Sequence, residues 1–164
     1  VQLRQPHLLV RISSLLEDHN LAPELLQLEI TESFIMNQAE EALTLLHQLK
    51  GLGIQLAIDD FGTGYSNLSY LRSFNATTLK IDRSFISTHA QWQANEPLVR
   101  AIIQMAASLG LTTVAEGIEN AETATLLAAL GCNEGQGYYW SPAVAEDKLP
   151  MLLTQLQVSN SPRL

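Results

Sequence analysis

The stretch QLAIDDFGTGYSNL, from Gln55 to Leu68, decides how the rest of this chain is interpreted. Three apolar residues run directly into two adjacent carboxylates, Asp59 and Asp60, and then into a loop that carries Gly62 and Gly64. A short apolar run that ends at polar and glycine residues is typical of a buried strand. Because neighbouring carboxylates repel each other where water is scarce, this strand end indicates bound cations.

The same pattern recurs along the chain, where apolar runs of strand length alternate with amphipathic segments. Besides the strand predicted at residues 55–60, we expect four further strands, at residues 25–31, 78–81, 112–117 and 132–137. Helical spacing predicts helices at residues 7–19, 39–50, 97–109, 121–130 and 148–156. The third of these is predicted to begin with Asn95 as its cap and Pro97 in its first turn.

Repeated βα units imply parallel strands with right-handed crossovers, either in an open sheet or in a closed barrel. A polar residue lies near the end of each predicted strand, and in a barrel such ends meet at one mouth. An open sheet usually binds nucleotides through a glycine-rich loop after its first strand, and the sequence has no such motif. We therefore predict an α/β fold, a (β/α)8 TIM-type barrel that is incomplete at the N-terminus, with about five βα units.

Composition limits the possible partners. The 164 residues, 46% of them hydrophobic, fit one domain, so residues 1–164 are assigned to a single barrel domain without a second one. The net charge of -8 disfavours binding to DNA or RNA polymers and to anionic membranes. Cys132 is the single cysteine, which fits a reducing compartment. No apolar run spans a membrane, so we expect a cytoplasmic chain, with an anchor elsewhere in a longer parent left open.

The polar strand ends suggest the chemistry. Glu29, Asp59, Asp60 and Glu116 offer hard oxygen ligands without clustered Cys or His, which favours Mg²⁺ or Mn²⁺. The adjacent aspartates could serve two ions, an arrangement that suits in-line attack of water on a phosphodiester. Lys80 would orient that water or balance the phosphoryl charge. The aromatic run 138–140 either packs in the core or offers a stacking surface for a base.

Five motifs together resemble the EAL domain family. They are LEITES, DDFGTGYSNL, LKIDRSFI, VAEGIE and GQGY, beginning at residues 28, 59, 79, 114 and 135. The resemblance extends over almost the whole chain in the right order. It implies a barrel phosphodiesterase that opens cyclic di-GMP to linear pGpG by a two-metal mechanism, acting as a homodimer in bacterial second-messenger signalling.

The resemblance also implies roles for individual residues. Glu29, Asp59 and Asp60 would bind the two metal ions, and Asp59 would bridge them. Lys80 would be the catalytic lysine near the attacking water, and Glu32 would brace the loop after Asp60. The catalytic water network would include Glu116, Glu119 and Gln136. The substrate would be contacted by Gly62, Tyr138 and Pro142.

Two departures from the family pattern shape the hypotheses. The metal-binding glutamate of the Glu-Ala-Leu strand and the asparagine ligand of the next strand are not in this chain; the EAL letters at residues 41–43 lie in a predicted helix. A basic residue that many members carry between the serine and proline of WSPAV is also missing. The alternative is therefore an inactive module that binds cyclic di-GMP or a protein partner. We expect this piece alone to be weakly active or inactive and to dimerise.

Overall fold

A computed structural model of the chain describes residues 7–37, 39–62, 71, 74–86 and 89–158. Five strands form one sheet in the order β1-β2-β3-β4-β5, which is also their order along the chain. The two pairs with a described register, β1 with β2 and β4 with β5, are parallel. Such a sheet, with each strand beside the next one along the chain, is what the barrel prediction requires. Two compact units divide the chain, Val1–Leu79 and Lys80–Leu164.

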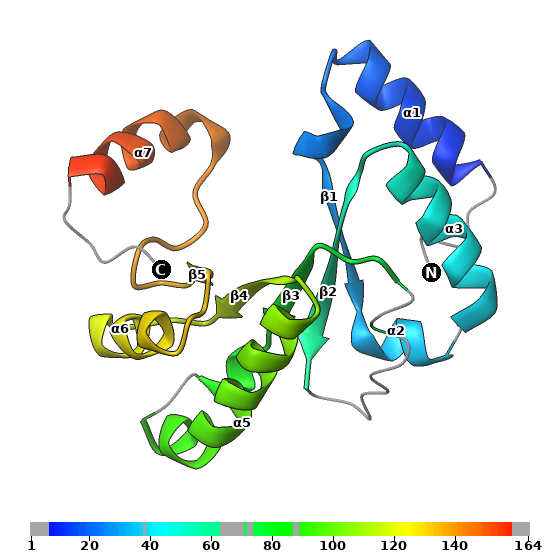
Figure 1. Cartoon of the computed structure of the whole chain (residues 1–164). Helices are drawn as coiled ribbons and strands as arrows, with labels where there is room; N and C mark the ends of the chain where they lie inside the picture. Colours follow the sequence, from blue (N-terminus) through cyan, green and yellow to red (C-terminus); the bar gives the residue numbers. More distant parts are fainter. Residues whose placement is uncertain (1–6, 38, 63–70, 72–73, 87–88, 159–164) are drawn as a thin grey trace. The chain divides into compact units, whose positions relative to one another are not determined.

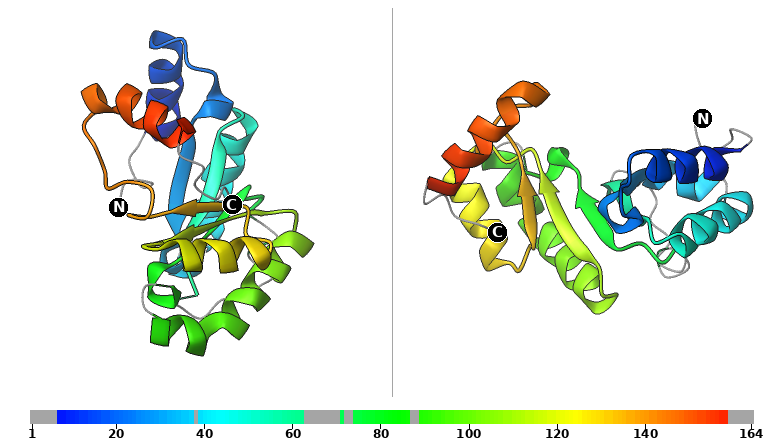
Figure 2. Two further views of the ribbon diagram at one scale, coloured as in Figure 1. Left: turned by 90° about the vertical axis from the view of Figure 1, so that its left-hand side faces the viewer. Right: turned by 90° about the horizontal axis from the view of Figure 1, so that it is seen from above.

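The first unit places helices beside the two parallel strands β1 and β2. Helices α1 and α3 lie side by side in this unit (Figures 1 and 2). Its elements, in chain order, are α1 (Leu8–Asp18), a 3₁₀ turn (Pro23–Leu25), β1 (Gln27–Thr31), α2 (Glu32–Asn37), α3 (Ala39–Gly51), β2 (Gln55–Phe61) and the beginning of β3 (Thr78–Ile81). The core holds side chains at most 2% exposed, among them Leu46, Leu49, Ile54, Leu56 and Ile58. Each contributes about 1.5–3 kcal/mol by its burial.

The second unit begins within β3 and holds the other two strands. Helix α5 packs against β4 within it (Figure 1). Its remaining elements are a 3₁₀ turn (Arg83–Phe85), α5 (His89–Ser108), β4 (Thr112–Glu116), α6 (Ala121–Ala129), β5 (Glu134–Gln136), a 3₁₀ turn (Glu146–Lys148) and α7 (Leu149–Val158). Its core includes Val99, Ala115, Ile118 and Leu127, all fully buried.

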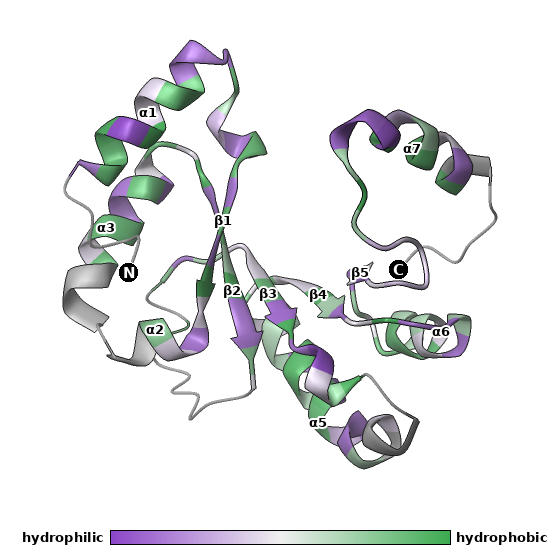
Figure 3. Cartoon of the chain, turned by 180° about the vertical axis from the view of Figure 1, so that it is seen from behind, coloured by the Kyte–Doolittle hydropathy of each residue, from purple (hydrophilic) through white to green (hydrophobic). Residues whose placement is uncertain are grey.

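Strand β2 changes from buried apolar residues to carboxylates toward its carboxyl end. Its central residues Leu56, Ala57 and Ile58 are at most 2% exposed, and the strand then passes into Asp59 and Asp60. Figure 3 shows this change from hydrophobic to hydrophilic toward the arrowhead of β2. The burial of the apolar run fixes the strand, so the two carboxylates are carried to its carboxyl end. Gly64, predicted in the loop that follows, lies outside the described residues.

The prediction for the start of α5 is wrong. The helix begins at His89, so Pro97 lies in its interior instead of its first turn, and Asn95 is a helical residue. Trp92, which the polar sequence around it places in a loop, is only 5% exposed within this helix. Burial of the indole contributes about as much free energy as an interior proline costs, roughly 3 kcal/mol. The end of the helix follows the expectation, because Gly110 adopts the left-handed conformation at φ 72°.

Candidate active site

Three acidic residues lie on β1 and β2, with Glu29 in the middle of β1 and with Asp59 and Asp60 near the carboxyl end of β2. The strand register pairs Glu29 with Ala57 and Thr31 with Asp59, so the two strands end at nearly the same level. The Oδ1 atom of Asp59 is buried. Asp60 has φ 55°, in the left-handed region, which a short polar side chain tolerates better than most.

A buried glutamate holds Gly62, the residue that directly follows β2. The backbone N–H of Gly62 donates a hydrogen bond to Oε2 of Glu32, with an N···O distance of 2.9 Å. Glu32 opens α2 and is 3% exposed, so this charge-assisted bond lies in a poorly solvated place. Gly62 has φ 97°, a conformation that side chains disfavour. The hydrogen bond thus ties the residue after Phe61 to the end of β1.

The second unit supplies a cation and an anion in direct contact. Lys80 Nζ on β3 and Glu116 Oε1 at the end of β4 are 2.7 Å apart. The side chains are 8% and 20% exposed, so the ammonium group is nearly buried while the carboxylate reaches the edge of solvent. Breaking such a pair would leave an uncompensated charge in a low dielectric. The contact therefore holds the ammonium group and the carboxylate next to each other.

A cleft of about 540 Å³ opens beside Glu116 in the same unit. Three of the predicted site residues line it with Glu116, namely Glu119, Gln136 and Tyr138. Tyr138 is 75% exposed, so core packing is the wrong interpretation for this ring, and the stacking surface remains. Tyr139 and Trp140 instead form an edge-to-face pair with ring centroids 5.0 Å apart. Pro142 is exposed and does not line the cleft.

Four residues of this cleft were not predicted from the sequence, namely Arg83, Ser84, Gly117 and Gly137. Arg83 and Ser84, in the 3₁₀ turn after β3, line it together with Glu116 and Glu119. Asp82 caps that turn, because its Oδ1 accepts a hydrogen bond from the N–H of Ser84 at 2.9 Å. The position of Arg83 inside the LKIDRSFI motif, three residues after Lys80, is the signal that could have drawn attention to it.

The acidic residues fit divalent cations in their donor chemistry, since carboxylate oxygens are the ligands of Mg²⁺ and Mn²⁺. Within the described part of the chain, no three His, Cys, Asp or Glu side chains gather closely enough to hold a metal ion. Cys132 is no candidate ligand or nucleophile, because burial raises the pKa of its thiol and keeps it protonated.

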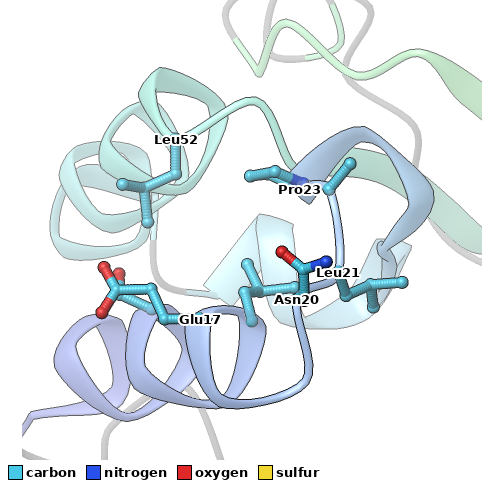
Figure 4. A pocket seen from close by; sticks show the side chains of 8 residues that line it. Glu17, Asn20, Leu21, Pro23 and Leu52 are labelled. Atoms are coloured by element: carbon cyan, nitrogen blue, oxygen red, sulfur yellow. The ribbon is translucent and has the colours of Figure 1, made fainter.

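A different hollow, of about 390 Å³, lies in the first unit (Figure 4). Its lining includes Glu17 and Asn20 from the end of α1 and Pro23 and Leu52 from the segments that precede β1 and β2. It therefore lies at the amino ends of these strands, opposite Asp59 and Asp60, and contains none of the predicted site residues. Across the described residues, no helix is long and apolar enough to cross a membrane.

Comparison with known proteins assigns the family. The sequence model of the EAL domain matches residues 1–143. The chain belongs to the EAL domain family. The resemblance drawn from the five motifs is thereby confirmed.

Relatives and solved structures of EAL proteins agree with this assignment. The bifunctional diguanylate cyclase/cyclic di-GMP phosphodiesterase MucR of Pseudomonas aeruginosa is 45% identical over 73% of this chain and 18% of its own length. The structure of the PaMucR phosphodiesterase in complex with c-di-GMP matches with a TM-score of 0.86 and 39% identity, over 90% of this chain and 60% of that one. The BlrP1 manganese/cy-diGMP complex of Klebsiella pneumoniae matches with a TM-score of 0.76 and 28% identity, over 86% of this chain and 36% of that one.

These EAL structures confirm the predicted fold class, since their TIM-type barrels contain the same run of strands and helices. The chain spans about a fifth of the length of the curated relatives that it matches first. What these proteins bind and hydrolyse is therefore carried to this chain as a proposal. The roles of the individual site residues likewise remain predictions.

Proposed function

We propose that this chain is part of a metal-dependent phosphodiesterase that hydrolyses cyclic di-GMP to linear pGpG. The family assignment and the cyclic di-GMP named for its relatives support this substrate. The structural observation that carries the proposal is the contact of 2.7 Å between Lys80 and Glu116. A nearly buried lysine, held by a carboxylate at the end of the next strand, is a costly arrangement that a structural role does not require.

Glu29, Asp59 and Asp60 are proposed to hold two Mg²⁺ or Mn²⁺ ions. All three side chains offer oxygen donors on the paired strands β1 and β2, and a relative is named as a manganese complex with the nucleotide. Divalent cations, when bound, would polarise the phosphodiester and offset its charge. The hydrogen bond from Gly62 to Glu32 would keep the loop after Asp60 in a fixed position relative to these carboxylates.

Lys80 is proposed to act on the reacting atoms themselves. Its ammonium group lies 2.7 Å from Glu116 and would donate hydrogen bonds to the attacking water or to the phosphoryl oxygens. Because the group is 8% exposed, its hydrogen bonds are stronger than they would be in water. Glu119 and Gln136 line the cleft beside Glu116 and would hydrogen-bond the water that attacks the phosphorus. Gly62, Tyr138 and Pro142 are proposed as substrate contacts.

We further propose that the natural protein works as a cytoplasmic homodimer. The single cysteine fits a reducing compartment, and the family resemblance implies a dimer interface linked to the loop after Asp60. Sedimentation of the purified full-length protein tests this point, and a strictly monomeric active enzyme would contradict it.

The test of the function is an assay of the full-length natural protein with cyclic di-GMP. We expect linear pGpG to accumulate with Mg²⁺ or Mn²⁺ and to stop accumulating when a chelator is added. Binding of the nucleotide without any hydrolysis, in the presence of either metal, would instead identify a non-catalytic module that senses cyclic di-GMP.

A further inference from the structure

Arg83 occupies a defined position in the cleft of the second unit. It follows β3 in a 3₁₀ turn that is fixed by the hydrogen bond from Ser84 N–H to Asp82 Oδ1. A Cβ atom at Gly117 would lie 2.5 Å from Cβ of Arg83, so the arginine sits directly against the backbone that follows β4. Gly117 also has φ 72°, which a side chain would disfavour. The start of the Arg83 side chain is therefore held at a strand end, although the residue as a whole is exposed.

The cleft is lined both by this arginine and by an exposed aromatic residue. Arg83 and Tyr138 both line it, and Tyr138 is 75% exposed. An aromatic side chain left open to solvent offers a stacking face for a nucleobase. An arginine offers a planar fork of N–H donors, which matches the O6 and N7 acceptors of guanine and meets a donor, the N6 amino group, at the corresponding position of adenine.

The charges in the cleft favour a base over a phosphate as the partner of Arg83. Glu116 and Glu119 contribute two negative charges to the lining, and Lys80 compensates that of Glu116 through its contact of 2.7 Å. Together with Lys80, the charged residues that line the cleft number two negative and two positive, so the cleft has no net positive charge to offer an anion. A neutral base with acceptors on its edge requires no such surplus.

We propose that Arg83 is a specificity-determining residue that recognises the O6 and N7 edge of a guanine base, which stacks on Tyr138. The inference rests on the proposed function, because it assigns a contact to the nucleotide of that same reaction. It makes the second unit the part of the chain that distinguishes cyclic di-GMP from cyclic di-AMP.

Equilibrium binding of both nucleotides to the full-length natural protein tests the inference. Binding is compared among the wild type, Arg83→Gln, Arg83→Lys and the control Arg100→Gln. Arg100 is an exposed arginine on α5 whose contact is with Glu96 at 2.7 Å. We expect Arg83→Gln to weaken cyclic di-GMP binding about 5- to 150-fold, with little change for cyclic di-AMP, because one bidentate pair is lost. Arg83→Lys should lose most of this preference, since lysine lacks the planar fork, and Arg100→Gln should retain it.

The remaining outcomes separate this inference from the function on which it rests. Equal weakening of both nucleotides would show a charge contact with phosphate and overturn base recognition, and so would unchanged binding of both. A Tyr138→Leu variant should weaken the two nucleotides to a similar degree, because every base has a stacking face. If the wild type hydrolyses cyclic di-GMP and the Arg83→Gln variant still prefers cyclic di-GMP over cyclic di-AMP, only the inference about Arg83 is overturned. A wild-type protein that binds neither nucleotide defeats the proposed function as well.

Discussion

The strand ends of the first unit and those of the second differ in charge. Strands β1 and β2 carry only acidic groups near their ends, Glu29, Asp59 and Asp60, and contain no lysine or arginine. In the second unit, Lys80 on β3 and Glu116 on β4 compensate each other at 2.7 Å. The two sets of strand-end residues therefore differ in how their charges are arranged. The acidic set offers the oxygen donors that divalent cations prefer, whereas the Lys80–Glu116 pair places opposite charges in direct contact.

The largest effect is expected from a change that breaks the packing at the strand ends of the second unit. A Cβ atom at Gly137 would lie 2.0 Å from the carbonyl oxygen of Ile118, a backbone atom that cannot move aside cheaply. We expect Gly137→Ala to cost more than about 4 kcal/mol of unfolding free energy, measured by urea denaturation. The matched control is Gly51→Ala, because nothing lies within 4 Å of that position. A Gly137→Ala variant as stable as the control would refute the close contact.

Removal of one carboxylate from the first unit tests the need for external cations. We expect Mn²⁺ at a hundred times its Kd to stabilise the wild-type protein by about 2.7 kcal/mol in thermal unfolding, through preferential binding to the folded state. Asp59→Asn should lose this stabilisation, while Asp18→Asn, a change of an exposed residue on α1, should keep it. Lys80→Met should keep it too. A metal response that disappears in Lys80→Met and survives in Asp59→Asn would reverse the comparison.

Loss of the hydrogen bond between Glu32 and Gly62 should have an effect of about the same size as the metal response. Glu32→Ala removes the charged acceptor of the Gly62 N–H, at 2.9 Å, and should cost about 1.5–3 kcal/mol in denaturant unfolding. Glu32→Gln retains an oxygen acceptor without the charge, so its cost should be smaller. Equal stability of the alanine variant and the wild type would show that the bond does not hold the loop.

The smallest effect is expected at a helix cap in the second unit, away from the charged groups. Oδ1 of Asn120 accepts a hydrogen bond from the N–H of Thr123 at 2.9 Å, at the start of α6. Asn120→Ala should cost about 1 kcal/mol, and Asn120→Asp should restore most of it. Metal-induced stabilisation should be the same in both variants. A change in that response would mean that the cap of α6 affects metal binding.

Most of the sheet could be predicted from local sequence because β1 to β4 contain apolar runs with clear ends. β3 has the predicted bounds, and β2 extends one residue beyond them, to Phe61. The last strand is shorter than predicted, Glu134–Gln136, because its sequence lacks an apolar run. Helix α2 was missed, since six residues after a strand contain too little periodicity to be recognised.

The features that escaped prediction depend on contacts between distant residues. The start of α5 is set by the burial of Trp92, which outweighs the local signal of Pro97. Arg83 enters the cleft because Gly117, 34 residues later, leaves room for it. The sequence indicates which residue types lie at the strand ends, but not which exposed side chains share a cleft with them.

Turnover by a Lys80→Met variant of the full-length natural protein tests the central proposal most directly. We expect pGpG formation with saturating Mn²⁺ to fall about 10²- to 10⁴-fold, the range for loss of a group that assists proton transfer, while cyclic di-GMP binding persists. Lys148→Met, a change of an exposed lysine in the 3₁₀ turn before α7, serves as the control and should leave the rate unchanged. A Lys80→Met protein that binds Mn²⁺ and hydrolyses cyclic di-GMP at the wild-type rate would contradict the proposed role of this lysine.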